Sequence, residues 1–358
     1  MATSVTRERI QKLRDVLRER GCHGVILTQE ATIAWLYQGR YHIGVATDAS
    51  CVAVLVTEDE VHVLVNNIEE QRLKDEEGLV ADSVIVHSWA DDALREQTLA
   101  QWKTLSGIVS EWELAPELQR MRMVQDEAGI RHLRELGVLV ARALTQTCVH
   151  LRPGVTEFEA AGMLSANCLN HGVEAIVNLV AGERRAPLYR HVMPTNDAIE
   201  RYAILSVGGR KNGLVVSATR MVAFGEVPSH LRAKYEAVLQ VEAALLSASA
   251  AGSRVDAVLE RGMAQYEAEG FPEEWHFHHQ GGVGGYLPRE VRAVPESKQR
   301  LEENMFVAWN PTISGVKAED TAIVTAQGAE ILTVDGDFPS APVRHRENEW
   351  NLPRILVL

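Results

Sequence analysis

The sequence has few of the features that mark membrane, secreted or nucleic-acid-binding proteins. Its apolar runs are short and interrupted, so no membrane span is expected. Lysine and arginine number 36 against 49 aspartate and glutamate, a formal net charge of -13 that argues against binding nucleic acid. The cysteines are scattered without the CxxC spacing of metal ribbons or redox motifs. The four are Cys22, Cys51, Cys148 and Cys168.

The first residues also lack the apolar core of a secretory signal. Residues 1–21 carry a helical pattern of charges with no apolar h-region, which excludes a signal peptide. Free thiols and the absence of a leader together predict a cytoplasmic protein. The chain of 358 residues, 46% hydrophobic and 24% charged, is long enough for two domains with sizeable cores.

The first third of the sequence alternates strand and helix patterns. This alternation predicts a small α/β domain over residues 1–118. The helices are expected at 6–20, 31–37, 68–77 and 91–104, and the strands at 24–29, 50–57, 60–67 and 83–89.

The remainder shows pairs of amphipathic helices, each followed by strands. This order predicts an α+β domain with an internal duplication over residues 119–343, followed by an irregular tail over 344–358. The apolar end of the tail is expected to cover the core or to dock on a partner subunit. Helices are expected at 117–151, 155–170, 229–250 and 255–269, and strands at 175–181, 202–208, 213–224, 276–283, 304–310 and 319–333.

Three motifs follow one another near the end of the second domain: WHFHHQGGVGGYLPRE at 275–290, MFVAWNP at 305–311 and GVKAEDT at 315–321. With RPGVTEFE and the hairpin sequence ILSVGGRKNGLVVSATRMV, they resemble the creatinase / aminopeptidase P / prolidase superfamily (peptidase M24). The resemblance covers about 330 residues. It implies the pita-bread fold, preceded by a creatinase-like N-terminal domain, and a homodimer.

The metal ligands of that family are mostly missing. In the metallo-members two aspartates, a histidine and two glutamates bind two divalent ions, and the matching positions here are Ser206, Ser217, Gly282, Asn310 and Glu319. Divalent ions need carboxylate oxygen or imidazole nitrogen, which only Glu319 could supply. The resemblance therefore implies a member without metal or other cofactor.

A different zinc site is conceivable from His276, His278 and His279. In a strand His276 and His278 would share a face, whereas His279 would point away. Spacing alone is weak support for such a site.

The resemblance also supplies candidate catalytic residues. His191 in PLYRHVMP stands where metal-free creatinase has its acid/base histidine, and an imidazole titrates near neutral pH. His278 and Glu319 are expected to orient water or the substrate nitrogen. Candidate substrate-binding residues are Arg289, Arg220, Trp309, Asn310, Ser206, Ser217 and Lys317, with Arg40 and Tyr41 reaching the pocket from the N-terminal domain of a dimer partner.

Each candidate also has an ordinary structural interpretation. His191 could be a surface histidine, and His278 could bond a backbone carbonyl. Arg289 and Arg220 could be salt-bridge partners, and Trp309 could be a core aromatic. The glycines at 281, 282, 284 and 285 could permit a close approach of strands, or could leave a cavity where metals would have been.

The function expected from the resemblance is metal-independent hydrolysis of a C–N bond in a small polar nitrogen compound, one that bears a carboxylate. Losing carboxylates while keeping arginine and lysine would favour an anionic ligand. A metal-free lyase or ring-opening enzyme is the nearest alternative, because one fold supports several reactions. A non-catalytic binder of small molecules or peptides and a true Xaa-Pro peptidase are the others.

Overall fold

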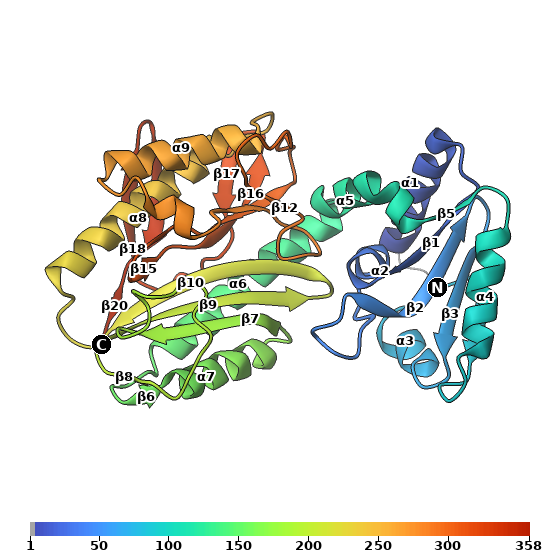
Figure 1. The fold of residues 1–358 in the computed structure, drawn as a ribbon, viewed down its shortest axis with the longest axis horizontal. Coiled ribbons are helices and arrows are strands. Elements are labelled where there is room, and N and C mark those ends of the chain that lie inside the picture. The colour runs from blue at the N-terminus through green and yellow to red at the C-terminus, as the bar shows by residue number, and fades with distance from the viewer. Residues whose placement is uncertain (1–3) are drawn as a thin grey trace. The chain divides into compact units, whose positions relative to one another are not determined.

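A computed structural model describes residues 4–358 of the chain (Figure 1). They form two compact units: the first contains the residues up to Arg122 with the turn Asn212–Leu214, and the second contains Met123–Lys211 and Val215–Leu358. The predicted boundary at residue 118 falls inside helix α5, Ala115–Met123. Among the described residues, none of the helices combines the length and apolar character that a membrane crossing needs.

The first unit is built on a five-stranded mixed sheet in the order β4-β3-β2-β1-β5. Strands β1, β2 and β3 pair antiparallel, whereas β4 and β5 join the two edges in parallel. The expected strands are all present, and β5 is an addition. Their bounds are β1 Gly24–Gln29, β2 Ala49–Thr57, β3 Val61–Asn66, β4 Ser83–His87 and β5 Ile108–Ser110.

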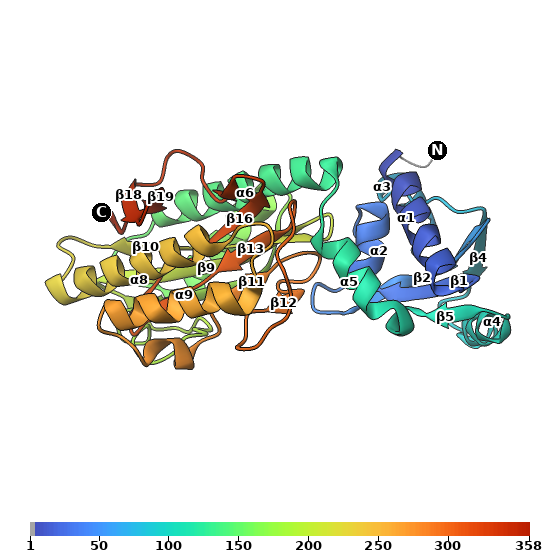
Figure 2. The same cartoon turned by 90° about the horizontal axis from the view of Figure 1, so that it is seen from above.

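Helices cover both faces of this sheet, as Figure 2 shows. On one face Trp102 of α4 packs against Ile26, Leu55 and Leu64 of the strands. On the other lie α1 and α2, where Leu13 and Leu17 are fully buried because the apolar stripe of α1 faces inward. The bounds are α1 Ser4–Arg20, α2 Glu30–Tyr37, α3 Glu70–Glu76 and α4 Ala93–Thr104.

The long helix predicted over 117–151 is two helices. Asp126 is extended and its side chain accepts a hydrogen bond from the backbone N–H of Gly129, so it caps a new helix rather than continuing the old one. Helix α6 therefore runs Glu127–Cys148 after α5. The next helix begins as expected: Thr156 and Glu159 form a capping box at the start of α7, Glu157–Asn170.

The second unit contains two large sheets and two helix pairs, which confirms the predicted α+β pita-bread class. Helices α6 and α7 pack on the sheet β20-β10-β9-β7, and α8 and α9 cover the sheet β12-β11-β13-β16-β17 (Figure 1). The bounds are β7 Glu174–Gly182, β9 Tyr202–Lys211, β10 Leu214–Ala223, α8 Ser229–Ala248, α9 Val255–Ala268, β11 Gly281–Val283, β12 Val291–Arg292, β13 Phe306–Trp309, β16 Asp320–Thr325, β17 Gly328–Ile331 and β20 Leu356–Val357.

The two sheets meet where β10 approaches the start of β16. An antiparallel bridge joins Thr219 to Glu319, and the N–H of Thr219 donates to the carbonyl of Glu319 over 2.9 Å. Nearby, the hydroxyl of Thr321 donates to the carbonyl of Ser217 over 2.8 Å. Strand residues with predicted functions therefore lie at the seam between the sheets.

Three further regions differ from the sequence-based expectation. The single strand expected over 319–333 is the antiparallel pair β16 and β17. The tail is ordered: β18 (Ser340–His345) and β19 (Asn348–Pro353) form a hairpin, and β20 adds to β10 in parallel. The strand expected over 276–283 starts only at Gly281, because residues before it form a 3-10 helix, η2. The remaining short elements are η1 Glu111–Leu114, η2 Glu274–Phe277, β6 Val155–Thr156, β8 Ala198–Ile199, β14 Thr312–Ile313 and β15 Val316–Lys317.

The glycines of β11 allow close strand contact and do not leave a cavity. A Cβ on Gly281 would lie 2.0 Å from the carbonyl oxygen of Ala308, and one on Gly282 would lie 2.1 Å from that of Val291. Both glycines also have positive φ, 113° and 148°, which disfavours any side chain. The strand-approach interpretation of this motif is therefore the correct one.

Candidate active site

A cavity of about 380 Å³ lies in the second unit, next to the seam between the sheets. Its polar lining comes from β9, β10 and β12, the loop after β7, the segments on both sides of β11, the residue after β13 and the segment before β16. Seven of the predicted site residues line it together: His191, Ser206, Ser217, Arg289, Asn310, Lys317 and Glu319.

Glu319 is the centre of an ionic network on the cavity wall. Its Oε1 accepts from Arg289 over 3.2 Å, and its Oε2 accepts from the hydroxyl of Thr219 over 2.7 Å and pairs with Lys317 over 2.8 Å. Burial alone would raise the pKa of this carboxyl, but Lys317 and Arg289 hold it below its usual value. Glu319 is therefore an anion with both oxygens engaged.

Lys317 connects the two sheets through its ammonium group. The Nζ atom donates to Ser206 Oγ over 3.1 Å in addition to its contact with Glu319. Ser206 in turn bonds the hydroxyl of Thr219 over 2.6 Å, so the ammonium is held by oxygen atoms of both sheets. Only 7% of the lysine side chain is exposed. A fixed positive charge thus lies between Ser206 and Glu319.

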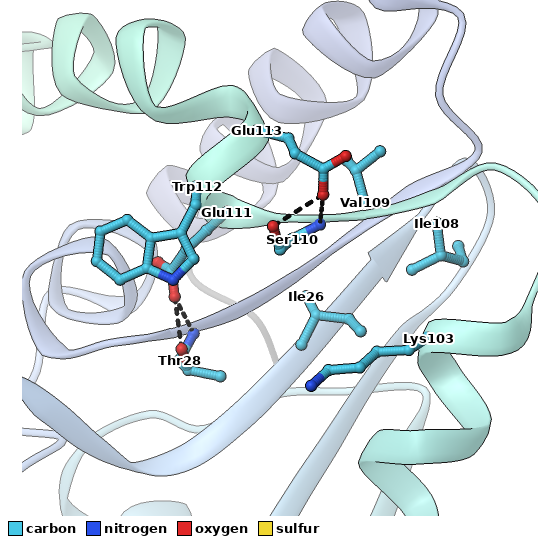
Figure 3. Close-up of a pocket in the computed structure, with 9 residues that line it drawn as sticks. All are labelled: Ile26, Thr28, Lys103, Ile108, Val109, Ser110, Glu111, Trp112 and Glu113. Atoms are coloured by element: carbon cyan, nitrogen blue, oxygen red, sulfur yellow. Dashed lines mark hydrogen bonds between the residues drawn. The ribbon is translucent and has the colours of Figure 1, made fainter.

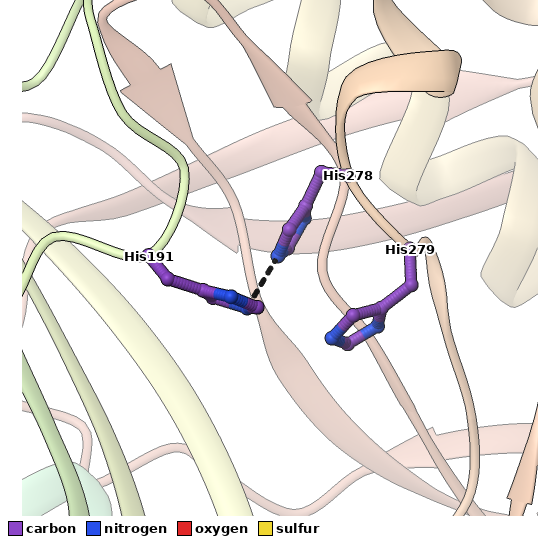
Figure 4. A group of neighbouring side chains, drawn as sticks. All are labelled: His191, His278 and His279. Carbon is purple, nitrogen blue, oxygen red and sulfur yellow. Dashed lines mark hydrogen bonds between the residues drawn. The ribbon is translucent and has the colours of Figure 1, made fainter.

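A chain of hydrogen bonds orients two histidines beside the cavity. The carbonyl oxygen of Asn310 can only accept, so the proton of His278 is assigned to Nδ1, which lies 3.2 Å from it. His278 Nε2 is then an acceptor, and it lies 3.2 Å from His191 Nε2 (Figure 4). With this assignment His191 carries its proton on Nε2 and keeps a lone pair on Nδ1.

The histidines near the cavity are neutral at physiological pH. Burial, followed by the charge of Lys317, lowers the pKa of His278 to about 2. Burial, followed by Arg289, lowers the pKa of His279 to about 4. The pKa of the exposed His191 is also below its ordinary value, because partial burial and then Lys317 disfavour the cation.

Two predicted binding residues are outside the cavity because side chains alternate along strands. Arg220 follows Thr219 on β10 and points to the opposite face, where it pairs with Asp320 at 3.0 Å with 2% of its side chain exposed. Trp309 is fully buried on β13, with its indole N–H donating to Ser249 Oγ over 2.9 Å. Neither side chain lines the cavity, and each makes contacts that fit its structural interpretation.

The two candidates from the N-terminal domain make contacts within the first unit. Tyr41 is fully buried and its hydroxyl donates to the carbonyl of Glu77 over 3.0 Å, so its side chain is not available to a neighbouring subunit. Arg40 pairs with the carboxylate of Glu77 over 2.8 Å and remains half exposed. Its proposed reach into a partner's pocket depends on the predicted homodimer, which stays a prediction.

Three residues of the site are absent from the predicted catalytic and substrate-binding set, although His279 belongs to the alternative zinc site. Arg292 lines the cavity from β12, directly opposite Gly282, and His279 lines it from the segment before β11. Thr219 orients Glu319 and Ser206. Thr219 was accessible to prediction, since strand alternation places it on the same face as Ser217. Arg292 could not be predicted in the same way, because its strand β12 has only two residues and so shows no alternation of polar and apolar side chains.

The donors at the five family metal positions do not fit a pair of divalent ions. Between them they offer one carboxylate, that of Glu319, and it is already bound by Lys317 and Arg289. An imidazole at position 282 would require β12 to move, since a Cβ there meets the carbonyl of Val291. Ser217 Oγ is engaged by Arg289 at 3.3 Å.

A second hollow, of about 330 Å³, lies in the first unit beside β5 (Figure 3). Its carboxylates have local structural partners. Glu111 Oε1 accepts from the N–H and hydroxyl of Thr28 over 2.7 and 2.6 Å, and Glu113 Oε2 accepts from the N–H and hydroxyl of Ser110, both over 2.8 Å. The bonds of Glu111 hold η1 against β1, and those of Glu113 form a capping box at the start of η1. Among the described residues that line this hollow, Lys103 is the other charged side chain.

Comparison with known protein families gives a match for each part of the chain. The profile of Metallopeptidase family M24 matches residues 131–326. The profile of the Creatinase/Prolidase N-terminal domain matches residues 9–124.

Individual relatives are distant but similar in length. "Uncharacterized peptidase YqhT" of Bacillus subtilis is 23% identical over 354 residues, covering 91% of this chain and 97% of that protein. The Xaa-Pro dipeptidase of Bacillus anthracis superposes with a TM-score of 0.76 at 20% identity, over 99% of this chain and 100% of that chain. The N-terminal domain of the FACT complex subunit SPT16 from chickpea superposes with a TM-score of 0.71 at 12% identity, over 93% and 97%.

Proposed function

The chain belongs to metallopeptidase family M24, and on that premise we propose that it hydrolyses a C–N bond in a small, carboxylate-bearing nitrogen compound without the family's pair of metal ions. Relatives named as peptidase and Xaa-Pro dipeptidase support hydrolysis of a C–N bond. The substrate class and the metal independence are argued from the cavity itself.

The observation that carries the proposal is the position of Lys317. Its ammonium contacts both Ser206 and Glu319, two of the positions that the resemblance assigns to metal ligands. A covalently attached cation there supplies positive charge to a bound substrate without an exchangeable ion. The same charge would repel a divalent ion from the one remaining carboxylate.

The balance of charge around the cavity favours an anionic substrate. Arg289, Arg292 and Lys317 line it against the single carboxylate of Glu319. Glu319 neutralises part of this charge and holds Lys317 and Arg289 in place, which favours a positioning role over direct contact with water. A carboxylate on the substrate would complete the charge balance and bond to the guanidinium of Arg289 or Arg292.

His191 is the proposed general base. It is exposed at the cavity, and its Nδ1 lone pair is free to take a proton when its Nε2–H is held by His278. His278 fixes the orientation of this ring through its own bond to the Asn310 carbonyl. After taking a proton from water, the His191 imidazolium can deliver it to the leaving nitrogen.

Asn310 completes the proposed substrate site. Its side chain lines the cavity, is 4% exposed, and has no hydrogen-bond partner for Oδ1 among the described residues. A buried acceptor without a donor costs about 1–3 kcal/mol. An N–H group of the substrate would satisfy it and place the scissile nitrogen near His191.

The test is a hydrolysis screen of N-acyl and guanidino amino acids, each paired with its neutral amide analogue. The assay contains a chelator throughout. We expect cleavage that prefers the carboxylate form and that falls by about 10²–10⁴-fold in His191→Ala. His276→Ala is the matched control, because that histidine is exposed and lies outside the cavity lining.

Two results would contradict the proposal. Equal turnover of acids and amides would remove the anionic substrate. Activity on Xaa-Pro peptides that is lost with chelator and restored by metal would identify a metallopeptidase instead.

A ligand-binding module without catalysis is the second candidate. The likeness to the SPT16 domain shows the shared fold alone, and a screen with binding but no turnover would favour this candidate.

A further inference from the structure

Three imidazoles from two separate segments meet at the edge of the cavity (Figure 4). His191 comes from the loop after β7, and His278 and His279 come from the segment between η2 and β11. Each offers one ring nitrogen, and the three nitrogens lie within 4.8 Å of one another. Three nitrogen donors that converge in this way can share one metal ion.

The spacing of the first two nitrogens suits one tetrahedral ion. Zinc–nitrogen bonds of about 2.05 Å place neighbouring ligand atoms about 3.3 Å apart in a tetrahedron. The Nε2 atoms of His191 and His278 are 3.2 Å apart. From the limit of 4.8 Å, the nitrogen of His279 would need to approach by about 1.5 Å at most, which a rotation of its side chain can provide.

A backbone carbonyl already orients one ring for a metal, and a second ring has a buried nitrogen without a partner. The Nδ1–H of His278 donates to the backbone carbonyl of Asn310, the second contact that metal-binding histidines commonly make, so Nε2 presents its lone pair to the cluster. His279 Nδ1 is buried with no hydrogen-bond partner among the described residues. An ion between the rings would replace the proton now shared by the two Nε2 atoms and give His279 a partner.

We propose that His191, His278 and His279 bind a single transition-metal ion of the zinc type, and that this ion inhibits the enzyme. The inhibition rests on the proposed function, because the ion would fix in place the histidine that acts as base. Imidazole ligands select zinc, nickel or copper over magnesium and calcium. This site is distinct from the two-metal positions of the family, which include none of the three histidines.

The surrounding charges shape what else would bind. Lys317, Arg289 and Arg292 line the cavity together with His191 and His279, and Glu319 is the single carboxylate among these lining residues. Repulsion by the three cations lowers the affinity for a dication compared with a carboxylate-rich site. The same field favours an anion as the fourth ligand on the open side, where the substrate carboxylate would otherwise lie.

The experiment is a titration of the metal-free full-length protein with Co²⁺, followed by visible absorption, and with Zn²⁺, followed by calorimetry. We expect one equivalent to bind, with the absorption of tetrahedral cobalt, and zinc to raise the Tm. His279→Ala should weaken binding by at least about tenfold. The matched control His276→Ala, from the same His-rich motif, should leave affinity within about twofold.

The outcomes separate the site from the function. If no stoichiometric binding occurs, or if both variants weaken it equally, the three-histidine site is wrong and the proposed hydrolysis is untouched. If zinc binds and hydrolysis stops in proportion to occupancy, both parts hold. If zinc binds and hydrolysis increases, the site stands, but inhibition and the metal-independent mechanism are both overturned.

Discussion

At the scale of single residues, Glu319 is held in a buried network that cannot lose one member without cost. It is 5% exposed and has Lys317, Arg289 and Thr219 as partners. A buried pair contributes little relative to apolar residues of the same size, but removing one partner leaves the other charge uncompensated. The network therefore fixes geometry more than it adds stability.

Replacing this carboxylate should give a pH-dependent loss of stability. Glu319→Gln leaves Lys317 and Arg289 unpaired and should cost about 3–5 kcal/mol at neutral pH. Because the folded pKa of Glu319 is depressed, its contribution is present above the unfolded pKa and is lost as the pH falls through the folded value. Urea unfolding of both proteins from pH 7 downward measures this. A difference that stays constant as the pH falls would rule out a depressed pKa.

The sequence predicted the small and polar residues of the cavity correctly, but it also placed two large residues there, Arg220 and Trp309, which lie elsewhere. The resemblance located His191, Arg289, Asn310 and Glu319 because their motifs keep a fixed order along the chain. Arg220 was expected at the cavity because a guanidinium group suits an anionic substrate. Strand alternation places it on the opposite face from Thr219, and the sequence already shows that alternation. The meeting of His279 with His191 could not be foreseen, since it depends on η2 displacing the expected strand.

At the scale of elements, long periodic segments were predictable and short ones were not. The apolar stripe of α1 and the alternation of β2 and β3 determine their types. The break between α5 and α6 was missed although Asp126 is a good N-cap, because the helical periodicity continues across it. The hairpin β18–β19 was missed because most of its residues are polar or exposed, and only a few apolar side chains, Val343 and Leu352 among them, mark the face that packs on the core.

Helix α8 carries a buried acid whose removal should stabilise the protein. Glu242 is fully buried and faces Asp320, Arg220 and Glu319 on other elements, and burial raises its pKa well above the ordinary value. Its contribution is therefore present below the unfolded pKa and is lost as the pH rises through the folded value.

Glu242→Gln keeps the shape and removes this titration. We expect a gain of about 1–3 kcal/mol at pH 8 and a smaller gain at pH 5, measured by urea unfolding. A gain that does not grow between these pH values would mean that the carboxyl is ionised in the folded protein, compensated by Arg220. Glu236→Gln, on the exposed side of the same helix, is the control and should change stability by less than about 0.5 kcal/mol.

At the scale of the whole molecule, every residue that lines the cavity belongs to the second unit. The fragment 123–358 contains that unit with its own core, which includes Trp309, Val307 and Leu245. We expect this fragment to fold cooperatively and to bind cobalt at one equivalent with an affinity within about tenfold of the whole chain. Circular dichroism and the same titration test this. A folded fragment without binding would show that the first unit contributes to the site.

The backbone bridge between Thr219 and Glu319 joins the two sheets, and the side chains of the same two residues belong to the ionic network. A ligand that draws Arg289 or Lys317 away from Glu319 would make this backbone hydrogen bond open more often. A ligand that supplies a further anion to Arg289 or Lys317 would make it open less often. The rate at which the amide proton of Thr219 exchanges with deuterium should therefore change when a ligand occupies the cavity, even when no product forms.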